Sequence, residues 1–433
     1  MMTISLTDQL RQARQASYTM ATLSAECKNK ILLRFAQLLE EKTDYLLAEN
    51  AKDTQAAEDA NISDVLAQRL KLDEGKISQL AEGIGDIAAF ENPTGKTVFK
   101  LLLDDGLMLE KVTVPLGVIG IIFESRPDVL PQILSLILKT GNAVVFKGGR
   151  ETKSSNAAMM TIVCQLNTEF SELPEGWACL LETREEALAM LDYPEYIDLA
   201  IPRGSSQLVQ SVMARSKVPV LGHADGICHQ YVHASANIEK SIPVIIDSKI
   251  QYPSACNALE TLLIDAEIAS EFLPVFAQAA TANDIILIGC EKTQKILPSI
   301  KMATAEDWKK EYGDLRLSVK VVECLQDAVQ HINTYGSHHT DGILAEDKRA
   351  QETFVNAIDA ANVYINASTR FADGFRYGFG AEVGISTSKT HARGPVGIDG
   401  LLSSQYRLVG EHHVVKDYVG SSAKAFKHVS INI

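Results

Sequence analysis

The chain has 433 residues, which is enough for two or three domains with full hydrophobic cores. Its 55 acidic and 41 basic residues give a net charge of -14, which argues against a nucleic-acid backbone or an anionic membrane as the main partner, because both require a basic face. Seven cysteines without CxxC pairs do not form the pattern of a disulfide framework or a zinc site, so we expect a reducing compartment.

The first part of the chain, from Leu6 to about Phe90, has the pattern of helices. Apolar residues recur among charged ones between Leu32 and Leu39, and alanine-rich stretches follow. Residues 1–15 lack the apolar core of a secretory signal, and no segment reaches the ~18 to 20 apolar residues that span a membrane. We therefore expect helical packing elements at the start of a cytoplasmic protein.

A β-hairpin is predicted between Thr97 and Pro115. Two apolar runs flank Asp104, Asp105 and Gly106, which form a strong turn signal. Because the edges of an isolated hairpin need partner strands, the segment is a candidate oligomerisation arm. An ordinary surface hairpin with blunted edges fits the same residues.

After the hairpin, short apolar strands alternate with helices. Residues 116–124 and 142–147 have the pattern of buried strands, and residues 129–140 form a helix between them. Further short strands and helices follow in the same alternation. This order predicts an α/β fold with a parallel, doubly wound sheet, in which ligands bind at the carboxyl ends of the strands.

Two of these strand ends carry residues suited to a phosphate group. Lys147 and Arg150 flank a Gly-Gly turn that includes Gly149 and lets a ligand approach the backbone. The second strand end carries Gly204, Ser205 and Ser206. A helix could begin at these small residues and offer its backbone N–H groups to a pyrophosphate. The GxGxxG fingerprint of dinucleotide sites is missing, so either strand end could be a simple turn.

Cys256 is the candidate nucleophile of the chain. It follows small residues, among them Ser254, and precedes an apolar run whose i, i+3, i+4 spacing predicts a buried helix. A thiolate at the start of such a helix is stabilised by the helix dipole. The alternative is a packing role, because free cysteines are among the most buried residues.

Five segments together resemble the aldehyde dehydrogenase superfamily in their order and spacing. Two further segments, residues 322–343 and 379–395, resemble the branch of that superfamily that reduces L-glutamate 5-phosphate. The resemblance extends over almost the whole chain, to about His413. The five superfamily segments are residues 114–127, 141–150 and 201–206, the stretch around Cys256, and residues 362–369.

The resemblance implies an aldehyde-dehydrogenase-like α/β fold with three parts. Residues 1–98 and 116–229 would form a Rossmann-like NADP-binding domain, and residues 230–397 an α/β catalytic domain. Residues 99–115 and 398–433 would form a small oligomerisation element of β structure. The resemblance further implies a homo-oligomer, either a dimer or a tetramer, and a glutamate 5-kinase as a possible partner.

The implied reaction is the reduction of L-glutamate 5-phosphate by NADPH to L-glutamate 5-semialdehyde with release of phosphate, the second step of proline biosynthesis from glutamate. Cys256 occupies the position of the family nucleophile. Its thiolate would attack the acyl carbon, phosphate would leave, and the resulting thioester would accept hydride. The backbone N–H of Cys256, with Asn257 or Ser125, would stabilise the oxyanion.

Two positions differ from the aldehyde-oxidising members of the superfamily. Those enzymes carry a glutamate that activates water where this chain has Val220, so hydrolysis of the thioester would be slow here. Oxidising members that use NAD often carry a glutamate three residues after the cofactor-site lysine, where this chain has Arg150. An arginine suits the 2′-phosphate of NADP, with Lys147 as its companion contact.

The anionic groups of the implied substrate require cationic partners. Arg126, Arg370 and Arg393 lie in or beside the matched segments, and a guanidinium fits a carboxylate or a phosphate. Ser254 is the fourth predicted substrate contact. Each arginine could instead form a structural salt bridge.

Histidines and acidic residues gather in two short segments that superficially resemble metal sites. Two adjacent histidines rarely face one ion, and no third ligand is evident, so we expect substrate contacts or structural roles and no metal. The residues concerned are His338, His339 and Asp341 in one segment, and His223, Asp225 and His229 in the other.

Two alternative functions are weighed against this interpretation. One is an aldehyde dehydrogenase or acylating enzyme of the same superfamily that does not use phosphate, which Val220 and residues 322–343 argue against. The other is a catalytically silent binding protein that keeps the fold. Such a protein is expected to lose the thiol or the cofactor-site lysine, whereas this chain keeps Cys256 and Lys147.

Overall fold

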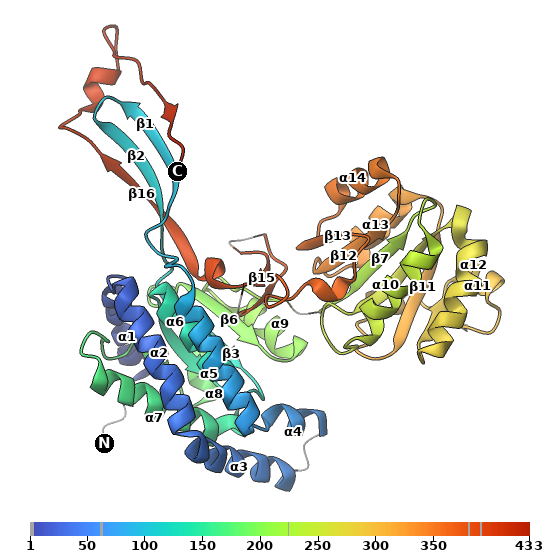
Figure 1. The fold of residues 1–433 in the computed structure, drawn as a ribbon, viewed down its shortest axis with the longest axis horizontal. Coiled ribbons are helices and arrows are strands. Elements are labelled where there is room, and N and C mark those ends of the chain that lie inside the picture. Colours follow the sequence, from blue (N-terminus) through green and yellow to red (C-terminus); the bar gives the residue numbers. More distant parts are fainter. Residues whose placement is uncertain (1–3, 61–63, 224, 380–381, 390–391) are drawn as a thin grey trace. The chain divides into compact units, whose positions relative to one another are not determined.

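The chain folds into two compact units in the computed structural model (Figure 1). The first unit comprises Met1–Val220, Gly380–Val383 and Gly397–Ile433, and the second comprises Leu221–Phe379 and Gly384–Val396. The structure describes residues 4–60, 64–223, 225–379, 382–389 and 392–433.

The first unit begins with helices, as the sequence predicts. Ser5, Ser24 and Asp73 precede three of them, and each side chain accepts a hydrogen bond from a backbone N–H group of the first turn. Apolar residues then recur at helical spacing and are buried, among them Leu10 and Phe35. The helices are α1 (Leu6–Met20), α2 (Ala25–Glu41), α3 (Thr43–Asp59), α4 (Asp64–Leu70) and α5 (Glu74–Ala89).

The core of the first unit is a parallel sheet with the strand order β5-β4-β3-β6. Val118 and Val145 of this sheet pack with Leu10 of α1 and Val212 of α9 in one apolar cluster. The elements are β3 (Val118–Phe123), α6 (Val129–Thr140), β4 (Ala143–Lys147), η1 (Arg150–Thr152), α7 (Lys153–Glu169), β5 (Ala178–Leu180), α8 (Arg184–Met190), β6 (Leu199–Arg203) and α9 (Ser206–Arg215).

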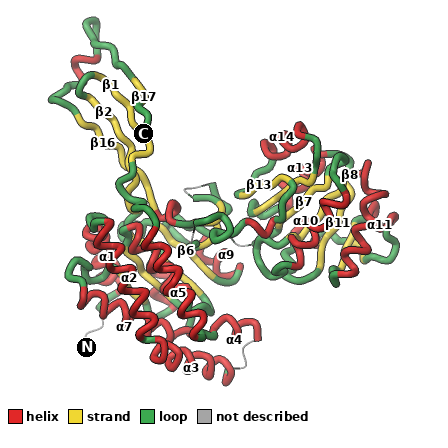
Figure 2. Tube along the Cα trace, in the orientation of Figure 1, coloured by secondary structure: helices red, strands yellow, loops and turns green. Residues whose placement is uncertain are grey.

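The predicted hairpin is confirmed, and it belongs to a four-stranded antiparallel sheet with the order β16-β2-β1-β17 (Figure 2). Gly106 has a φ of 71°, which a glycine adopts without strain at the turn of the hairpin. The C-terminal segment therefore supplies the partners of both hairpin edges. The elements are β1 (Thr97–Asp104), β2 (Leu107–Pro115), η4 (Ile398–Leu401), β16 (Leu402–Val409), η5 (Val415–Tyr418) and β17 (Val429–Ser430).

The second unit is built on a parallel sheet with the strand order β10-β9-β11-β8-β7-β12-β13. An antiparallel pair, β14 (Gly384–Ser386) and β15 (Gly394–Val396), also belongs to this unit. The sheet is formed by β7 (Cys228–Val232), β8 (Leu259–Asp265), β9 (Ile286–Gly289), β10 (Lys301–Met302), β11 (Arg316–Val322), β12 (Thr340–Leu344) and β13 (Asn362–Ile365).

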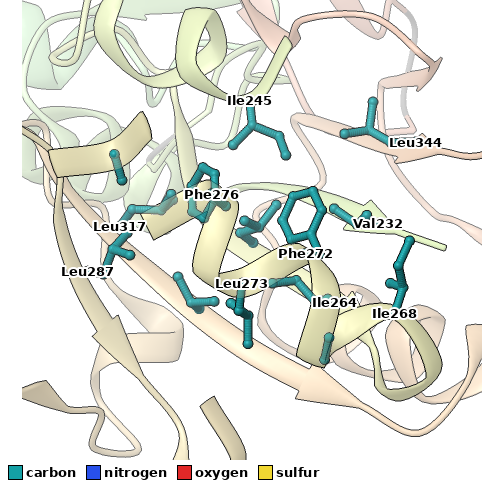
Figure 3. Close-up of a cluster of buried hydrophobic side chains, with 14 of the residues drawn as sticks. Val232, Ile245, Ile264, Ile268, Phe272, Leu273, Phe276, Leu287, Leu317 and Leu344 are labelled. Carbon is teal, nitrogen blue, oxygen red and sulfur yellow. The ribbon is translucent and has the colours of Figure 1, made fainter. Parts of the chain in front are cut away.

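Helices cover both faces of this sheet. Ile264 of the central strand packs with Phe272 and Phe276 of α11 on one face (Figure 3), whereas Leu263 packs with Ile332 of α13 on the other. Successive side chains of a strand point to opposite faces of the sheet. Because helices cover both faces, the odd and the even positions of a central strand must both be apolar. The helices are α10 (Ile238–Ile250), α11 (Ala266–Ala282), α12 (Glu291–Ile296), η2 (Asp307–Lys309), α13 (Leu325–Tyr335), α14 (Lys348–Ala357) and η3 (Thr369–Phe371).

The prediction of a buried helix after Cys256 is wrong. Leu259–Asp265 is the strand β8, which lies between β7 and β11, and all of its residues are buried. A central parallel strand buried on both faces carries apolar residues at neighbouring positions, so its pattern can coincide with the i, i+3, i+4 spacing of a helix. Cys256 therefore does not open a helix, and the helix-dipole argument for its thiolate does not apply.

The aldehyde-dehydrogenase-like α/β fold class predicted from the sequence agrees with these parallel sheets. Among the residues that the structure describes, no helix is both long enough and apolar enough to cross a bilayer.

Candidate active site

Cys256 lies in a tight turn between α10 and β8. The N–H of Ala255 donates to the carbonyl of Tyr252 at 3.1 Å, and the N–H of Ala258 donates to the carbonyl of Ala255 at 2.9 Å. The backbone of Cys256 packs directly against Gly226, where a Cβ atom would lie 2.0 Å from the carbonyl oxygen of Cys256. Only glycine leaves room for this approach, so the turn is held between β8 and the segment before β7.

The position of Cys256 follows from the strand order. The strands β8, β7 and β12 are parallel neighbours, so the segments before them meet at one edge of the sheet. Cys256 precedes β8, His223 precedes β7, and His339 directly precedes β12. The α/β pattern of the sequence predicts ligands at the carboxyl ends of the strands, whereas the candidate nucleophile lies at the amino ends of the strands of this sheet.

Two imidazole rings surround the thiol. One ring nitrogen of His223, one ring nitrogen of His339 and the sulfur of Cys256 all lie within 4.8 Å of one another. The two rings meet edge to face, with centroids 5.0 Å apart. Both histidines are recognisable in the sequence, but their proximity to Cys256 is not, because only the pairing of β7 with β12 and β8 brings the three residues together.

The hydrogen bonds of the two rings leave basic nitrogens at the site. Nδ1 of His223 lies 3.0 Å from the carbonyl oxygen of Ile385, and a carbonyl only accepts, so Nδ1 carries the proton and Nε2 of the neutral ring has the lone pair. Burial, followed by the charge of His223, holds the pKa of His339 well below its usual value. His339 is therefore neutral, and Nε2 of this buried ring has no hydrogen-bond partner among the described residues.

Asn257 and Arg370 lie beside the thiol. Nδ2 of Asn257 donates to the carbonyl of Ala372 at 2.8 Å, which leaves one amide hydrogen for another acceptor. The side chain of Arg370 is largely buried, and its Nε donates to Oε1 of Gln251 at 2.8 Å. Burial, followed by the charge of Arg376, lowers the pKa of Arg370, and the negative charge of a Cys256 thiolate opposes this shift.

Two other predicted substrate contacts have different surroundings. Ser254 is exposed, two residues before Cys256. Nη2 of Arg393 donates to Oδ1 of Asp359 at 2.8 Å, and Nε donates to the carbonyl of Thr387 at 3.2 Å. The salt bridge considered in the sequence analysis is thus present for Arg393, and its contact with substrate remains a prediction.

The remaining histidines of the two segments have structural partners. The N–H of His229 donates to Oδ1 of Asp341 at 2.9 Å, and Nδ1 of the same ring lies 3.2 Å from that oxygen. These two residues face each other in the pairing of β7 with β12. Nδ1 of His338 lies 2.6 Å from the carbonyl oxygen of Asp359. These hydrogen bonds of His229 and His338 hold strands and loops together. The two residues therefore have structural roles, unlike His339.

The predicted cofactor lysine lies at the end of β4 in the first unit. Nζ of Lys147 donates to the carbonyl of Gly148, and burial lowers the pKa of the amine, with smaller opposing effects of nearby charges. Arg150 is exposed at the start of η1, directly after Gly149. The turn thus offers two positive charges at one strand end, with the carboxylate of Glu151 close to the backbone of Gly149.

Ser125 and Arg126 follow β3 in the first unit. Ser125 has a φ of 50°, and both its N–H and its hydroxyl bind Oε1 of Glu151, at 2.6 and 2.8 Å. Its hydroxyl is therefore engaged with a carboxylate. Arg126 is exposed one residue later. The role of Ser125 at the oxyanion and that of Arg126 at the substrate remain predictions.

The segment from Gly204 to Ser206 begins the helix α9, as the sequence predicts. Ser205 caps the helix by accepting from the N–H of Leu208 at 3.3 Å. The N–H and hydroxyl of Ser205 bind Oε2 of Glu124, at 3.0 and 3.1 Å. A carboxylate thus occupies the position that an anionic ligand would take, as expected for N–H groups at a helix start.

A model of the aldehyde dehydrogenase family matches residues 5–310. The chain belongs to the aldehyde dehydrogenase family. Two curated relatives place it among the gamma-glutamyl phosphate reductases. The reductase of Acetivibrio thermocellus is 48% identical over 429 residues, which cover 99% of this chain and 99% of the relative. The reductase of Pelotomaculum thermopropionicum is 49% identical over 422 residues, which cover 98% of this chain and 96% of the relative.

Solved structures support the same assignment. The crystal structure of gamma-glutamyl phosphate reductase from Thermotoga maritima is 38% identical and matches with a TM-score of 0.93, covering 95% of this chain and 100% of that chain. An acetylating aldehyde dehydrogenase from Geobacillus thermoglucosidasius is 18% identical, with a TM-score of 0.63 over 94% of this chain and 97% of that chain. The similarity to the acetylating enzyme concerns the fold alone. Together the matches confirm the predicted aldehyde-dehydrogenase-like fold class.

Proposed function

We propose that this protein reduces L-glutamate 5-phosphate to L-glutamate 5-semialdehyde, with NADPH as the reductant and phosphate as the leaving group. The full-length relatives carry the name of this activity, and the reaction would serve proline biosynthesis. The observation that carries the proposal is the thiol of Cys256 with the ring nitrogens of His223 and His339 at the amino ends of β8, β7 and β12. A nucleophile beside a base is the arrangement that acyl transfer requires.

The first step is the formation of a thioester. Nε2 of His223 accepts the proton of the Cys256 thiol, and the sulfur attacks the acyl carbon of the substrate. The carbon–sulfur bond forms, the carbon–oxygen bond to phosphate breaks, and phosphate leaves with the electron pair. The backbone N–H of Cys256 and the remaining amide hydrogen of Asn257 stabilise the oxyanion during this step. Arg370 attracts an anionic group of the substrate to the same site.

The second step reduces the thioester. Hydride addition to the acyl carbon gives a thiohemiacetal on Cys256, which releases the aldehyde and leaves the thiolate. Water must not compete with hydride for the thioester. The apolar side chain of Val220 packs against the core of the first unit at the position where oxidising relatives carry their basic glutamate, so no carboxylate activates water from there.

The turn after β4 is suited to a nicotinamide dinucleotide phosphate. Lys147 and the exposed Arg150 offer two positive charges to phosphate or ribose on either side of Gly149. The N–H groups at the start of α9, among Gly204, Ser205 and Ser206, would hold the pyrophosphate once it displaces the carboxylate of Glu124. When bound, NADPH supplies the hydride. An arginine rather than a glutamate at position 150 favours NADPH over NADH.

The antiparallel sheet of the first unit supports self-association. Tyr406, Leu408 and Val409 of β16 are exposed by 63, 59 and 62%. Exposed apolar side chains on an edge strand are unusual in a monomer, because such an edge pairs readily with another chain. We infer a homo-oligomer, a dimer or a tetramer, assembled through this sheet. We also propose that the protein is located in the cytoplasm. A glutamate 5-kinase would transfer the labile acyl phosphate to this protein.

The reverse reaction tests the proposed activity. Purified protein is mixed with glutamate 5-semialdehyde, NADP and inorganic phosphate, and the absorbance of NADPH is followed. We expect continuous NADPH formation only when phosphate is present, and no NADPH at all in a Cys256→Ala variant. The control is Cys290→Ser, which changes a partly buried thiol at the start of α12 and should keep the wild-type rate. NADPH formed equally well without phosphate would identify water as the acceptor and replace the proposal with aldehyde oxidation.

A further inference from the structure

The cluster around Cys256 has the composition of a metal site. We propose that Cys256, His223 and His339 bind a soft divalent cation such as Zn²⁺, and that the bound cation reversibly caps the nucleophile. Thiolate and imidazole are the ligands that Zn²⁺ prefers in proteins. The sequence analysis expected no metal because no third ligand was evident, and Cys256 supplies that ligand from a different loop.

The geometry requires only a small contraction. With Zn–S and Zn–N bonds of about 2.3 and 2.1 Å, ligand atoms around a tetrahedral ion lie roughly 3.4 to 3.6 Å apart. The three ligand atoms now lie within 4.8 Å of one another. The widest pair therefore has to close by at most about 1.4 Å, which rotations of two side chains can share. The fourth position remains open to solvent, an anion or the substrate.

The surroundings of both rings suit metal ligation. Nδ1 of His223 donates to the carbonyl of Ile385 at 3.0 Å, and metal-binding histidines commonly donate their other ring N–H to such a carbonyl. His339 is wholly buried, and its Nε2 has no hydrogen-bond partner within the described ranges. A buried polar atom without a partner is costly, so a cation at this position would satisfy it.

The charges near the site indicate that the cation binds reversibly rather than permanently. The largely buried Arg370 interacts with Cys256, and its positive charge opposes a cation. Three protein ligands also leave the fourth position of a tetrahedral ion to water or another small ligand, whereas structural zinc is held by four protein ligands. The consequence for catalysis rests on the proposed function: a capped thiolate cannot attack the acyl carbon.

Cobalt provides a direct probe, because Co²⁺ bound to a thiolate gives a charge-transfer absorption that does not depend on substrate or activity. Chelator-treated protein is titrated with Co²⁺, and then with Zn²⁺ to displace it. We expect one Co²⁺ per chain, no thiolate band in Cys256→Ser, and an affinity weakened at least about tenfold in His223→Asn, where the amide can keep the bond to Ile385. A Cys290→Ser variant is the matched control and should bind like the wild type.

A thiolate band that persists in Cys256→Ser, or that disappears in Cys290→Ser, would overturn the site. An unchanged affinity in His223→Asn would overturn it as well, and this variant avoids the buried His339, whose replacement can unfold the chain. In the reverse reaction, Zn²⁺ should abolish NADPH formation and a chelator should restore it. Co²⁺ binding without any catalytic activity would leave the metal site standing and refute the proposed function instead.

Discussion

Replacement of Gly226 by alanine tests how tightly the turn of Cys256 is held. The new Cβ atom would lie 2.0 Å from the carbonyl oxygen and 2.4 Å from the Cα atom of Cys256, whereas ordinary contacts begin at 3.4 Å. The obstacle is backbone, so the turn itself has to move by about 1 to 1.4 Å. Misplacement of a reacting group by ~1 Å can cost about 100-fold in rate, and overpacking costs roughly 1–3 kcal/mol of stability.

The assay combines the reverse reaction with urea unfolding. For Gly226→Ala we expect kcat to fall about 100-fold while the protein still unfolds cooperatively, with a free energy of unfolding lowered by roughly 1–3 kcal/mol. Gly342→Ala is the matched control, because Gly342 lies in β12 of the same sheet and its Cβ atom would have its nearest neighbour, the carbonyl oxygen of Tyr364, at 3.5 Å. Full activity in Gly226→Ala, or an equal loss in Gly342→Ala, would refute the reasoning.

The remaining predictions concern the buried ion pair behind the site and the cofactor turn. Lys249→Met removes the cationic partner of the fully buried Glu260, whose carboxylate lies 2.8 Å from the amine and keeps backbone partners such as the N–H of Gly313. Urea unfolding should show a loss of about 3–5 kcal/mol, most of it recovered when Glu260→Leu is added. Burial raises the pKa of Glu260 from 4.5 to about 7, so the folded state retains a proton that the unfolded state loses. The wild type should therefore lose up to about 3 kcal/mol of stability relative to Glu260→Gln as pH rises from 4.5 to 7, and a flat difference would contradict this. Arg150→Glu should lower kcat/KM for NADP by about 10- to 100-fold and spare that for NAD, and equal losses with both cofactors would count against a 2′-phosphate contact.

The sequence predicted those parts of the fold whose signals are local. The hairpin from Thr97 to Pro115 has a turn signal between two apolar runs, and the helix after Ser205 begins at a capping residue. Such signals depend on a few neighbouring residues and survive tertiary packing. The stretch from Leu259 to Asp265 has no local signal that separates a strand from a helix, because a strand buried on both faces loses its alternation.

The cluster of Cys256, His223 and His339 illustrates what the sequence could not supply. Cys256 was predicted from the sequence as the nucleophile, but its proximity to His223 and His339 depends on which strands are neighbours. The signal that could have found it is positional: each of the three residues comes shortly before an apolar strand. With β7 placed between β8 and β12, these three segments must meet at one edge of the sheet. Strand order, however, is a property of the tertiary fold.

The thioester on Cys256 is the central claim, and a single-turnover experiment without phosphate tests it most directly. Protein is mixed with excess NADP and glutamate 5-semialdehyde, NADPH is followed by absorbance, and the acid-quenched digest is analysed by mass spectrometry. The account predicts a burst of one NADPH per chain, a glutamyl group on the peptide that contains Cys256, and turnover only after phosphate is added. Continuous NADPH formation without phosphate, or a burst without acylation of Cys256, would contradict it.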